Sequence, residues 1–202
     1  SAGVHFIFES ELEMISADCS TASLRAPDLE ILADHIVLAA GAWTGELTAS
    51  LKMPLPVIPV RGQAALVHAG EVCPPCVIFS PDGYVVPRAG GEIFAGSTVE
   101  YVGFNRNTTN EGIDQIWRAA RWMLPGLAER KPEQSWAGLR PGTEDGMPIV
   151  GPLPGYGNLW IATGHFQNGI LLAPVTARVI REWVVTGEPG RDMSIFLPDR
   201  FL

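Results

Sequence analysis

The segment from Leu159 to Leu172 reads LWIATGHFQNGILL, which predicts a strand, a glycine-bounded turn and a helix in immediate succession. Such an element directs backbone N–H groups and the positive end of the helix dipole toward a ligand beside it. An electron-rich, partly anionic ligand would be stabilised there by about 0.3–2 kcal/mol. A plain strand-to-helix connection that needs glycine for its turn predicts the same pattern, so both interpretations stay open.

Two further side chains have the chemistry to hold a carboxylate. Arg140, in the string GLRPGT, lies between glycines and a proline, so it loses little conformational entropy on binding, and its guanidinium fork matches a carboxylate. The alternative is a surface ion pair with Glu144 or Asp145, which would contribute little. Tyr84, in GYVVPR, follows a turn at the start of a predicted strand. Its hydroxyl could point into a pocket, although a half-buried sheet tyrosine is the commoner outcome.

The cysteines predict neither a metal site nor a disulfide scaffold. Cys73 and Cys76 form a C-P-P-C pair, but a four-ligand zinc site needs a second pair, and Cys19 has no histidine at ligand spacing. We therefore interpret 73–76 as a proline-stiffened loop. The odd number of cysteines favours a reducing compartment, which predicts a cytoplasmic location.

Composition excludes several classes of function. The 202 residues are 47% hydrophobic and 18% charged, which is enough to bury a core. A net charge of −8 without a Lys/Arg cluster argues against nucleic-acid binding. The apolar runs are far shorter than the ~20 residues of a membrane helix, so we expect no membrane span. The 22 glycines and 17 prolines favour many short strands over a helical bundle.

These side chains must be positioned by an α+β fold. The apolar run Ile36–Ala40 predicts a strand buried on both faces. One helix is expected from Thr109 or Asn110 to Pro125, and a second over 169–185, closed by Gly187. Short strands joined by turns indicate an antiparallel sheet in the middle of the chain. The strands are expected at 4–8, 12–15, 23–26, 36–40, 57–67, 77–79, 84–86, 93–97, 135–139 and 159–162.

Six strings, taken together and in this order, resemble the FAD-dependent D-amino-acid oxidase superfamily, and within it the glycine oxidases of thiamine synthesis. The resemblance extends over nearly the whole chain. The strings are GAWT at 41–44, PVRGQ at 59–63, GYVVPR at 83–88, WAGLRPGTEDGMPIVGP at 136–152, GHFQNGILLAP at 164–174 and PDRF at 198–201.

The resemblance implies three segments. Residues 1–52 would be the C-terminal part of an FAD-binding domain, 53–145 an antiparallel-sheet substrate domain with one helix, and 146–202 a return to the FAD-binding domain with its final helix. The family opens on a GxGxxG turn that holds the pyrophosphate, and this string is absent from the sequence. We therefore expect the chain to be the C-terminal portion of a longer protein, or one partner of a protein whose nucleotide-binding half is a separate chain.

The resemblance also implies roles for individual residues. Arg140 would grip the substrate carboxylate with help from Tyr84, and no residue would act as acid or base. Gln167 would also bind the substrate, by a hydrogen bond in place of the charge of the arginine that glycine oxidase has there, which leaves the choice of substrate open. FAD would be bound without a covalent bond, because 141–146 contains no cysteine. The residues expected to contact FAD are Leu12, Gly41, Gly164, His165, Phe166, Gln167, Asn168, Gly169, Ile170 and Leu171.

The activity that follows from the resemblance is oxidation of a small amino acid or amine to its imine, with oxygen as electron acceptor and hydrogen peroxide as product. Glycine, sarcosine and D-amino acids are the expected substrates, and the chain alone is expected to be inactive. A dehydrogenase that passes electrons to quinone, one subunit of a heteromeric enzyme and a stand-alone carboxylate-binding module remain as alternatives. A homo-oligomer is also compatible with the sequence.

Overall fold

The computed structural model describes residues 3–17 and 21–201, and it has the mixed α+β architecture expected from the sequence. Its contacts divide the chain into two compact units. The flanking unit comprises Ser1–Ile58 and Pro141–Leu202, and the central unit comprises Pro59–Arg140. The chain passes from one unit to the other within β5 (Val57–His68) and returns within β9 (Gln134–Thr143).

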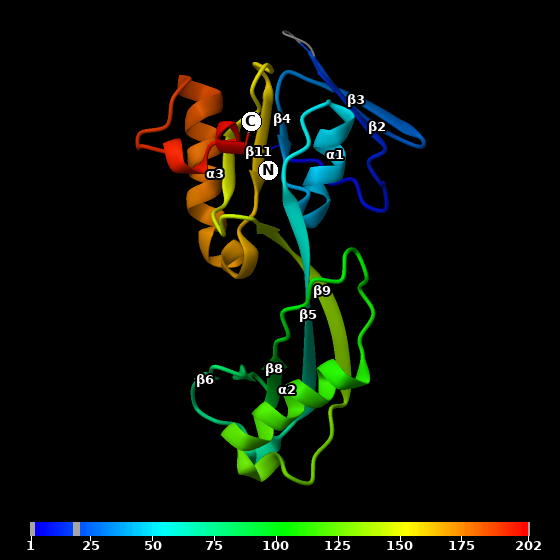
Figure 1. Ribbon diagram of the computed structural model, residues 1–202, viewed down its shortest axis with the longest axis vertical. Coiled ribbons are helices and arrows are strands. Elements are labelled where there is room, and N and C mark those ends of the chain that lie inside the picture. Colours follow the sequence, from blue (N-terminus) through cyan, green and yellow to red (C-terminus); the bar gives the residue numbers. More distant parts are fainter. Residues whose placement is uncertain (1–2, 18–20, 202) are drawn as a thin grey trace. The chain divides into compact units, whose positions relative to one another are not determined.

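The flanking unit contains two three-stranded sheets and two helices. One sheet is an antiparallel meander of order β1-β2-β3. The other has the order β10-β11-β4, in which β11 runs parallel to β4 and antiparallel to β10. Helix α3 contacts β10 and β11 (Figure 1). The bounds are β1 (Met14–Ala17), β2 (Ala22–Ala26), β3 (Leu29–Ala33), β4 (Ile36–Leu38), α1 (Thr44–Ser50), β10 (Ile149–Pro152), β11 (Leu159–Thr163) and α3 (Gly169–Thr186).

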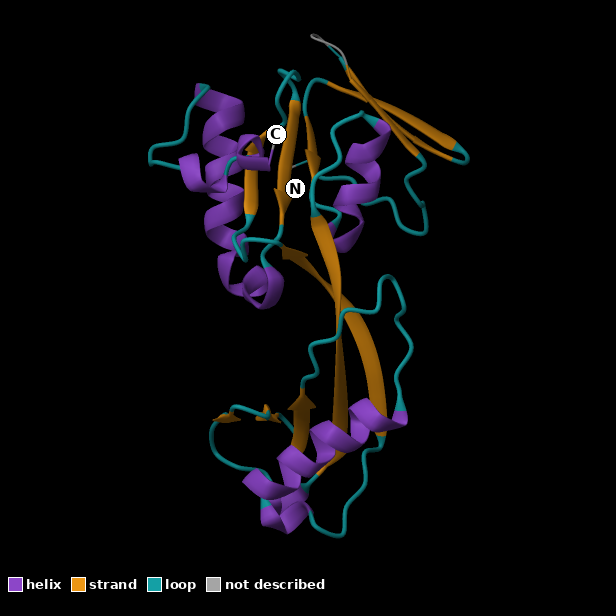
Figure 2. Cartoon of the chain, in the orientation of Figure 1, coloured by secondary structure: helices purple, strands orange, loops and turns teal. Residues whose placement is uncertain are grey.

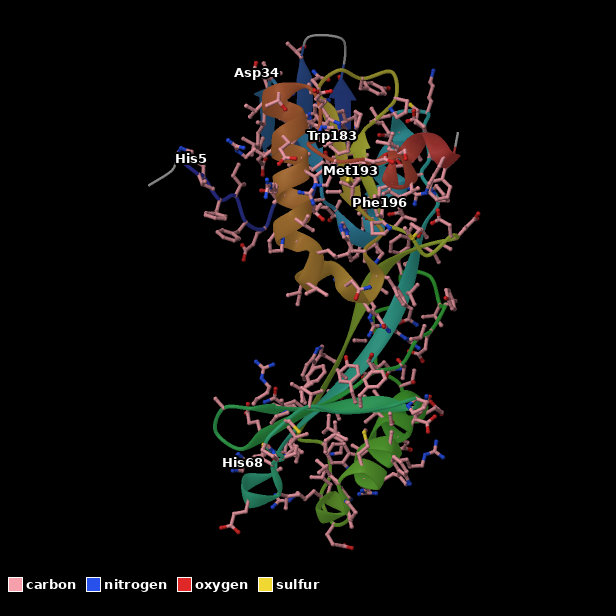
Figure 3. The ribbon with its side chains drawn as sticks, turned by 90° about the vertical axis from the view of Figure 1, so that its left-hand side faces the viewer. His5, Asp34, His68, Trp183, Met193 and Phe196 are labelled. Atoms are coloured by element: carbon pink, nitrogen blue, oxygen red, sulfur yellow. The ribbon has the colours of Figure 1, made fainter. Side chains whose placement is uncertain are left out.

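Strand β11 is the centre of this unit because both of its faces are buried. Leu159 and Ile161 are fully buried in a cluster that also includes residues of β4 and β10. Trp160 points the other way and packs against Trp183 of α3, with ring centroids 6.3 Å apart. Figure 3 shows Trp183 near Met193, which packs against the separate cluster that contains Trp160 and Trp183. Burial on two faces explains why this strand is almost uninterruptedly apolar.

The central unit is a five-stranded sheet of order β6-β7-β8-β5-β9 with one helix packed against it. β6 and β7, β7 and β8, and β8 and β5 pair antiparallel. Helix α2 begins after Thr109, whose Oγ1 accepts a hydrogen bond from the N–H of Gly112. Its buried stripe includes Ile116 and Trp117. The helix packs against β7 and β8 of the sheet (Figure 2). The remaining bounds are β6 (Ile78–Ser80), β7 (Gly83–Arg88), β8 (Glu92–Gly96) and α2 (Asn110–Met123).

The two predicted helices are confirmed at their starts and ends. α2 has the Thr109 cap and is followed by Pro125, and α3 ends at Gly187, whose φ of +84° is the left-handed conformation that glycine favours. Pro174 lies inside α3, at its sixth residue, where it cannot donate the intrahelical hydrogen bond to the carbonyl of Ile170, yet the helix continues to Thr186. Among the described residues, no helix combines the length and the apolar character needed to cross a bilayer.

Three expectations about the first forty residues are wrong. Residues 4–8 are mostly apolar but form no strand, and Phe6 and Phe8 are 75% and 78% exposed. The strand expected over 36–40 ends at Leu38, and it is not buried on both faces because Val37 is 44% exposed. β1 begins at Met14, so Leu12 precedes the strand in which we expected it. Helix α1 and strands β3 and β10 were not predicted.

Candidate functional site

A glycine turn connects β11 to α3. Gly164 has a φ of +76°, and a Cβ added there would lie 2.9 Å from Thr143 Cγ2 and 3.1 Å from the N of Ile149. The position therefore requires glycine both for its backbone conformation and for its packing. A short 3-10 helix, Phe166–Asn168, follows before α3 begins at Gly169. The predicted strand–turn–helix element is thus present at this position.

The N-terminus of α3 leaves its first backbone N–H groups available to a ligand. The preceding Asn168 makes no side-chain capping hydrogen bond, and the first turn contains no acidic residue. Ile170 and Leu171, in that turn, are 95% and 78% exposed. N–H donors at the positive end of an 18-residue helix, beside exposed apolar side chains, suit a planar group that is apolar over most of its area and carries partial negative charge at one edge.

A second glycine turn lies beside the first. Gly41, which follows β4, has a φ of +55°, and its carbonyl accepts hydrogen bonds from Thr163 Oγ1 and Thr44 Oγ1, both at 2.9 Å. Thr163 is the last residue of β11, so this bond joins the ends of two parallel neighbouring strands. Ligands of open α/β sheets bind outside the carboxyl ends of such strands. The geometry therefore groups Gly41 with Gly164 and the start of α3.

His165 turns back toward α3. Its Nε2 lies 3.0 Å from Thr176 Oγ1, and burial of the ring lowers its pKa, which favours the neutral imidazole. The side chain also lines an apolar cavity of about 730 Å³ bounded by β4, β11 and α3. The hydrogen bond ties the turn to the second turn of the helix, so we assign His165 a structural role in holding the turn.

The other predicted contacts in this unit lie apart from the turns or point to solvent. Gln167 is exposed in the 3-10 helix. Leu12 lines a separate cavity of about 180 Å³, beside Leu24 and Ile31 of the β1-β2-β3 sheet. The structure therefore does not bring Leu12 to the glycine turns.

The central unit contains a pocket of about 210 Å³ that includes both predicted carboxylate-binding residues, Tyr84 and Arg140. Arg140 Nη1 donates to the carbonyl of Thr98 at 3.1 Å, and Nη2 donates to Ser97 Oγ at 2.7 Å. These bonds fix the plane of the guanidinium. The full lining is Gly62, Gln63, Ala64, Tyr84, Phe94, Ser97, Trp136, Gly138, Leu139 and Arg140.

Aromatic rings line one side of this pocket. Tyr84 stacks on Phe94 with centroids 6.0 Å apart, and Phe94 meets Trp136 at 5.5 Å. β5 lies between the strands of Phe94 and Trp136, and its small residues Gly62 and Ala64 line the pocket between the rings. The sequence did not single out Phe94 or Trp136. The signal that could have found them is the alternation of large and small side chains from strand to strand, with Phe94 on β8, Gly62 and Ala64 on β5, and Trp136 on β9.

Asp145, one of the two acids proposed as an alternative partner for Arg140, pairs with Arg200. Arg200 Nε lies 2.7 Å from Asp145 Oδ2, and this bond is the main reason that the pKa of Asp145 falls to about 2. Asp145 also accepts a hydrogen bond from the N–H of Met147, which closes the turn before β10. The closing PDRF string therefore stabilises the turn through Arg200.

Cys73 and Cys76 lie in the loop before β6. Both thiols are free; Cys73 is partly buried and donates to the carbonyl of Glu92, whereas Cys76 is exposed. Cys19 lies outside the described residues. Within 3–17 and 21–201 there is no group of three or more His, Cys, Asp or Glu side chains arranged to hold a metal ion.

The sequence matches the family described as FAD dependent oxidoreductase over residues 1–183. The chain belongs to this family. This confirms the resemblance, and FAD is the cofactor of the family. The two glycine turns and the start of α3 fit this group, because they offer backbone donors beside exposed apolar side chains.

Individual proteins give a finer comparison. The chain is 41% identical to a glycine oxidase of Pseudomonas aeruginosa over 169 residues, which are 84% of this chain and 46% of that protein. It is 41% identical to the bifunctional protein ThiO/ThiG of Nostoc over 199 residues, which are 96% of this chain and 28% of that protein. The crystal structure of glycine oxidase from Geobacillus kaustophilus superposes with a TM-score of 0.93 at 31% identity, covering all of this chain and 55% of that one. The chain thus spans about half the length of the glycine oxidases that it matches, or less.

Proposed function

We propose that this chain provides the substrate pocket and the C-terminal flavin-contacting elements of an amino-acid oxidase that resembles glycine oxidase. The observation that carries the proposal is the meeting of Tyr84 and Arg140 in one pocket of the central unit. The guanidinium fork matches a carboxylate, and a pocket of about 210 Å³ suits a small amino acid or amine.

The pocket residues orient the substrate and leave proton transfer to solvent. Arg140 holds the carboxylate, the Tyr84 hydroxyl adds a neutral donor, and the rings of Phe94 and Trp136 form an apolar wall beside the amine. The ten lining residues include no carboxylate and no imidazole, so the pocket supplies no general base. A neutral amine held by its carboxylate presents its Cα–H in a fixed direction, which is the contribution expected of a positioning site.

The glycine turns and the start of α3 are the residues that we propose to hold FAD. When bound, FAD supplies a hydride acceptor for the substrate α-carbon. The N-terminal N–H groups of α3 favour negative charge beside them, which lowers the free energy of a reduced, anionic ring. We propose contacts from Gly41 and from Gly164 to Leu171, with no covalent bond. An adenine contact from Leu12 remains a prediction.

The remaining features of the proposed activity are as follows. The substrate is oxidised to an imine, oxygen accepts the electrons and hydrogen peroxide forms; transfer to a quinone is the alternative. Gln167 would contribute a hydrogen bond in place of a charge, which favours a substrate with one carboxylate group.

The sequence lacks a GxGxxG turn, so we propose that the 202 residues alone bind FAD weakly and do not oxidise the substrate. The two free thiols of Cys73 and Cys76 favour a cytoplasmic location. A homo-oligomer is compatible with the proposed function.

A second candidate is a carboxylate-binding module without redox function. It is favoured by one observation: every residue that lines the pocket belongs to the central unit, so carboxylate binding needs no nucleotide domain. Titration with FAD distinguishes the two candidates. Quenching of flavin fluorescence that is lost in Gly164→Val supports the oxidase, whereas carboxylate binding without any FAD binding supports the module.

The carboxylate site itself is tested by titrating the ¹⁵N-labelled chain with glycolate. We expect saturable shifts of pocket signals in the wild type and a loss of affinity of about 10- to 150-fold in Arg140→Ala, since a charge-assisted contact contributes about 1.5–3 kcal/mol. Arg118→Ala, on the exposed face of α2, is the matched control and should bind like the wild type. Equal affinity in Arg140→Ala and Arg118→Ala would contradict the proposed site.

A further inference from the structure

The strand segment Arg61-Gly62-Gln63 presents different chemistry on its two faces. Arg61 and Gln63 point to one side, where their side chains are buried, with residue exposures of 4% and 0%. Gly62 faces the other side and lies under the guanidinium of Arg140, where an added Cβ would overlap it. Three consecutive residues therefore form the floor of the carboxylate pocket and a buried polar cluster behind it.

Glu100 is the centre of this polar cluster. Its carboxylate accepts a two-pronged bond from Arg61, with Nε to Oε2 at 2.9 Å and Nη2 to Oε1 at 3.1 Å. The backbones of Arg61 and Glu100 also bond each other in both directions, at 2.8 and 3.0 Å. Burial by itself would raise the pKa of Glu100, but hydrogen bonds from Arg61, Gln63 and Thr98 outweigh it and lower the pKa. The carboxylate is therefore ionised and held in one orientation.

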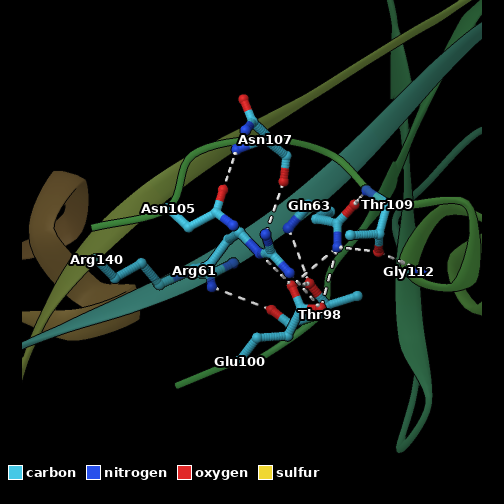
Figure 4. Close-up of polar contacts among 9 residues, drawn as sticks. All are labelled: Arg61, Gln63, Thr98, Glu100, Asn105, Asn107, Thr109, Gly112 and Arg140. Carbon is cyan, nitrogen blue, oxygen red and sulfur yellow. Dashed lines mark hydrogen bonds and ion pairs between the residues drawn. The ribbon is translucent and has the colours of Figure 1, made fainter. Parts of the chain in front are cut away.

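Gln63 fixes the cluster to the start of α2. Its Nε2 donates to both oxygens of Glu100, at 3.1 and 2.9 Å, and to Thr109 Oγ1 at 3.1 Å. Its Oε1 accepts the N–H of Thr109 at 2.8 Å. Arg61 adds a bond from Nη1 to the carbonyl of Asn107 at 2.8 Å. Both ends of the 97–109 segment are thus fastened to β5 (Figure 4).

Thr98 connects this cluster to Arg140. Its Oγ1 donates to Glu100 Oε2 at 2.8 Å and accepts the backbone N–H of Gln63 at 3.0 Å, and the residue is 3% exposed. Its carbonyl oxygen accepts Arg140 Nη1, and the neighbouring Ser97 Oγ accepts Nη2. Two of the acceptors that set the plane of the guanidinium therefore lie on the residue clamped by Glu100 and on the residue before it.

We propose that Glu100, held by Arg61 and Gln63, is a positioning residue that acts through Thr98 to orient Arg140 for a substrate carboxylate. The inference rests on the proposed function. Of these five residues, Arg140 and Gln63 line the pocket, whereas Glu100, Arg61 and Thr98 act without lining it. A rigid acceptor pair limits the guanidinium to one plane, which lowers the entropy lost when a carboxylate binds in two-pronged geometry.

Thr98→Val is the variant that tests the inference. Valine keeps the shape of threonine and its strand preference, but it removes both hydrogen bonds of Oγ1 and releases the Ser97–Thr98 backbone. We expect glycolate affinity to fall at least fivefold, and the Arg140 Nε–H signal to move and broaden in ¹⁵N spectra of the free chain. Thr98→Ser restores the hydroxyl and should return the affinity to within twofold of the wild type and the Arg140 signal to its original position.

Thr48→Val is the matched control. Thr48 is fully buried in the flanking unit, and its Oγ1 likewise donates to a carbonyl, that of Gly45, and accepts a backbone N–H, that of Leu55. A loss of general stability should therefore be similar in the two valine variants, as measured by Tm. Only Thr98→Val should change glycolate affinity and the Arg140 signal.

The outcomes separate this inference from the proposed function. If the wild type binds glycolate and Arg140→Ala does not, but Thr98→Val keeps wild-type affinity and an unchanged Arg140 signal, the positioning role is overturned and the carboxylate site stands. Equal losses in Thr98→Val and Thr48→Val overturn it as well. If Thr98→Val does not fold, Glu100→Gln, which keeps the shape and removes the charge, must show the same Arg140 shift. Absence of wild-type binding overturns both proposals.

Discussion

Gly62→Ala is expected to remove carboxylate binding while leaving the fold intact. The new Cβ would overlap the guanidinium of Arg140, which is the far end of a flexible side chain and can move away. Gly62 does not have a positive φ, and alanine in a strand loses less backbone entropy on folding than glycine by about 0.5–1 kcal/mol. We therefore expect Tm to be unchanged or slightly raised.

The expected loss of affinity follows from the displaced contact. Moving the guanidinium off Gly62 breaks its bonds to Thr98 and Ser97 and its alignment with a ligand carboxylate. A charge-assisted contact of about 1.5–3 kcal/mol corresponds to a loss of about 10- to 150-fold in glycolate affinity. Titration of the ¹⁵N-labelled chain measures this loss, and differential scanning fluorimetry measures Tm.

Gly138→Ala is the matched control for this prediction. Gly138 also lines the pocket from a strand, but a Cβ added there meets no atom within 4 Å. It should bind glycolate like the wild type. If Gly62→Ala binds as well as Gly138→Ala, the contact between Arg140 and the β5 backbone has no part in carboxylate binding.

Three other outcomes are expected. The pKa of Asp145 falls to about 2 because Arg200 binds it, so this pair stabilises the fold fully above the ordinary pKa of 3.8 and loses its contribution as pH falls toward 2; Asp145→Asn should flatten the acid unfolding curve in that window, and an unchanged curve would count against the pair. Burial lowers the pKa of His165, so the unfolded chain binds its proton first and stability should fall as pH drops below 6.5. His165→Gln, which can still bond Thr176, should reduce that slope in Tm, and a wild-type slope would contradict the assignment. Ile161 is fully buried in β11, so Ile161→Ala should lower the free energy of urea unfolding by about 2–5 kcal/mol, and a change below 1 kcal/mol would mean that the strand is not central to the core.

The sequence was sufficient where the signal is local. The glycine turn at Gly164 and the end of α3 at Gly187 depend on backbone conformations that few other residues adopt, so the glycine at each position indicates the turn directly. Tyr84 and Arg140 were found from their turn and proline contexts and from the resemblance. The prediction that they share a ligand could not come from spacing, because they lie 56 positions apart and sheet pairing decides which side chains meet.

Long-range pairing also explains what the sequence did not reveal. Tyr84 lies opposite Gly96 in the register of β7 and β8, and this pairing places Ser97 and Thr98 beside the pocket. No local pattern encodes that register. Conversely, residues 4–8 are apolar enough to suggest a strand, but residues 3–13 form none, because an apolar run does not by itself supply a neighbouring strand.

The central claim is that the pocket beside Arg140 binds the carboxylate of a small amino acid. A crystal structure of the chain with glycolate tests it most directly. We expect both carboxylate oxygens within hydrogen-bond distance, about 2.7–3.2 Å, of the Arg140 guanidinium, with the ligand against the rings of Phe94 and Trp136. Glycolate bound elsewhere, with no carboxylate oxygen in contact with Arg140, would contradict it.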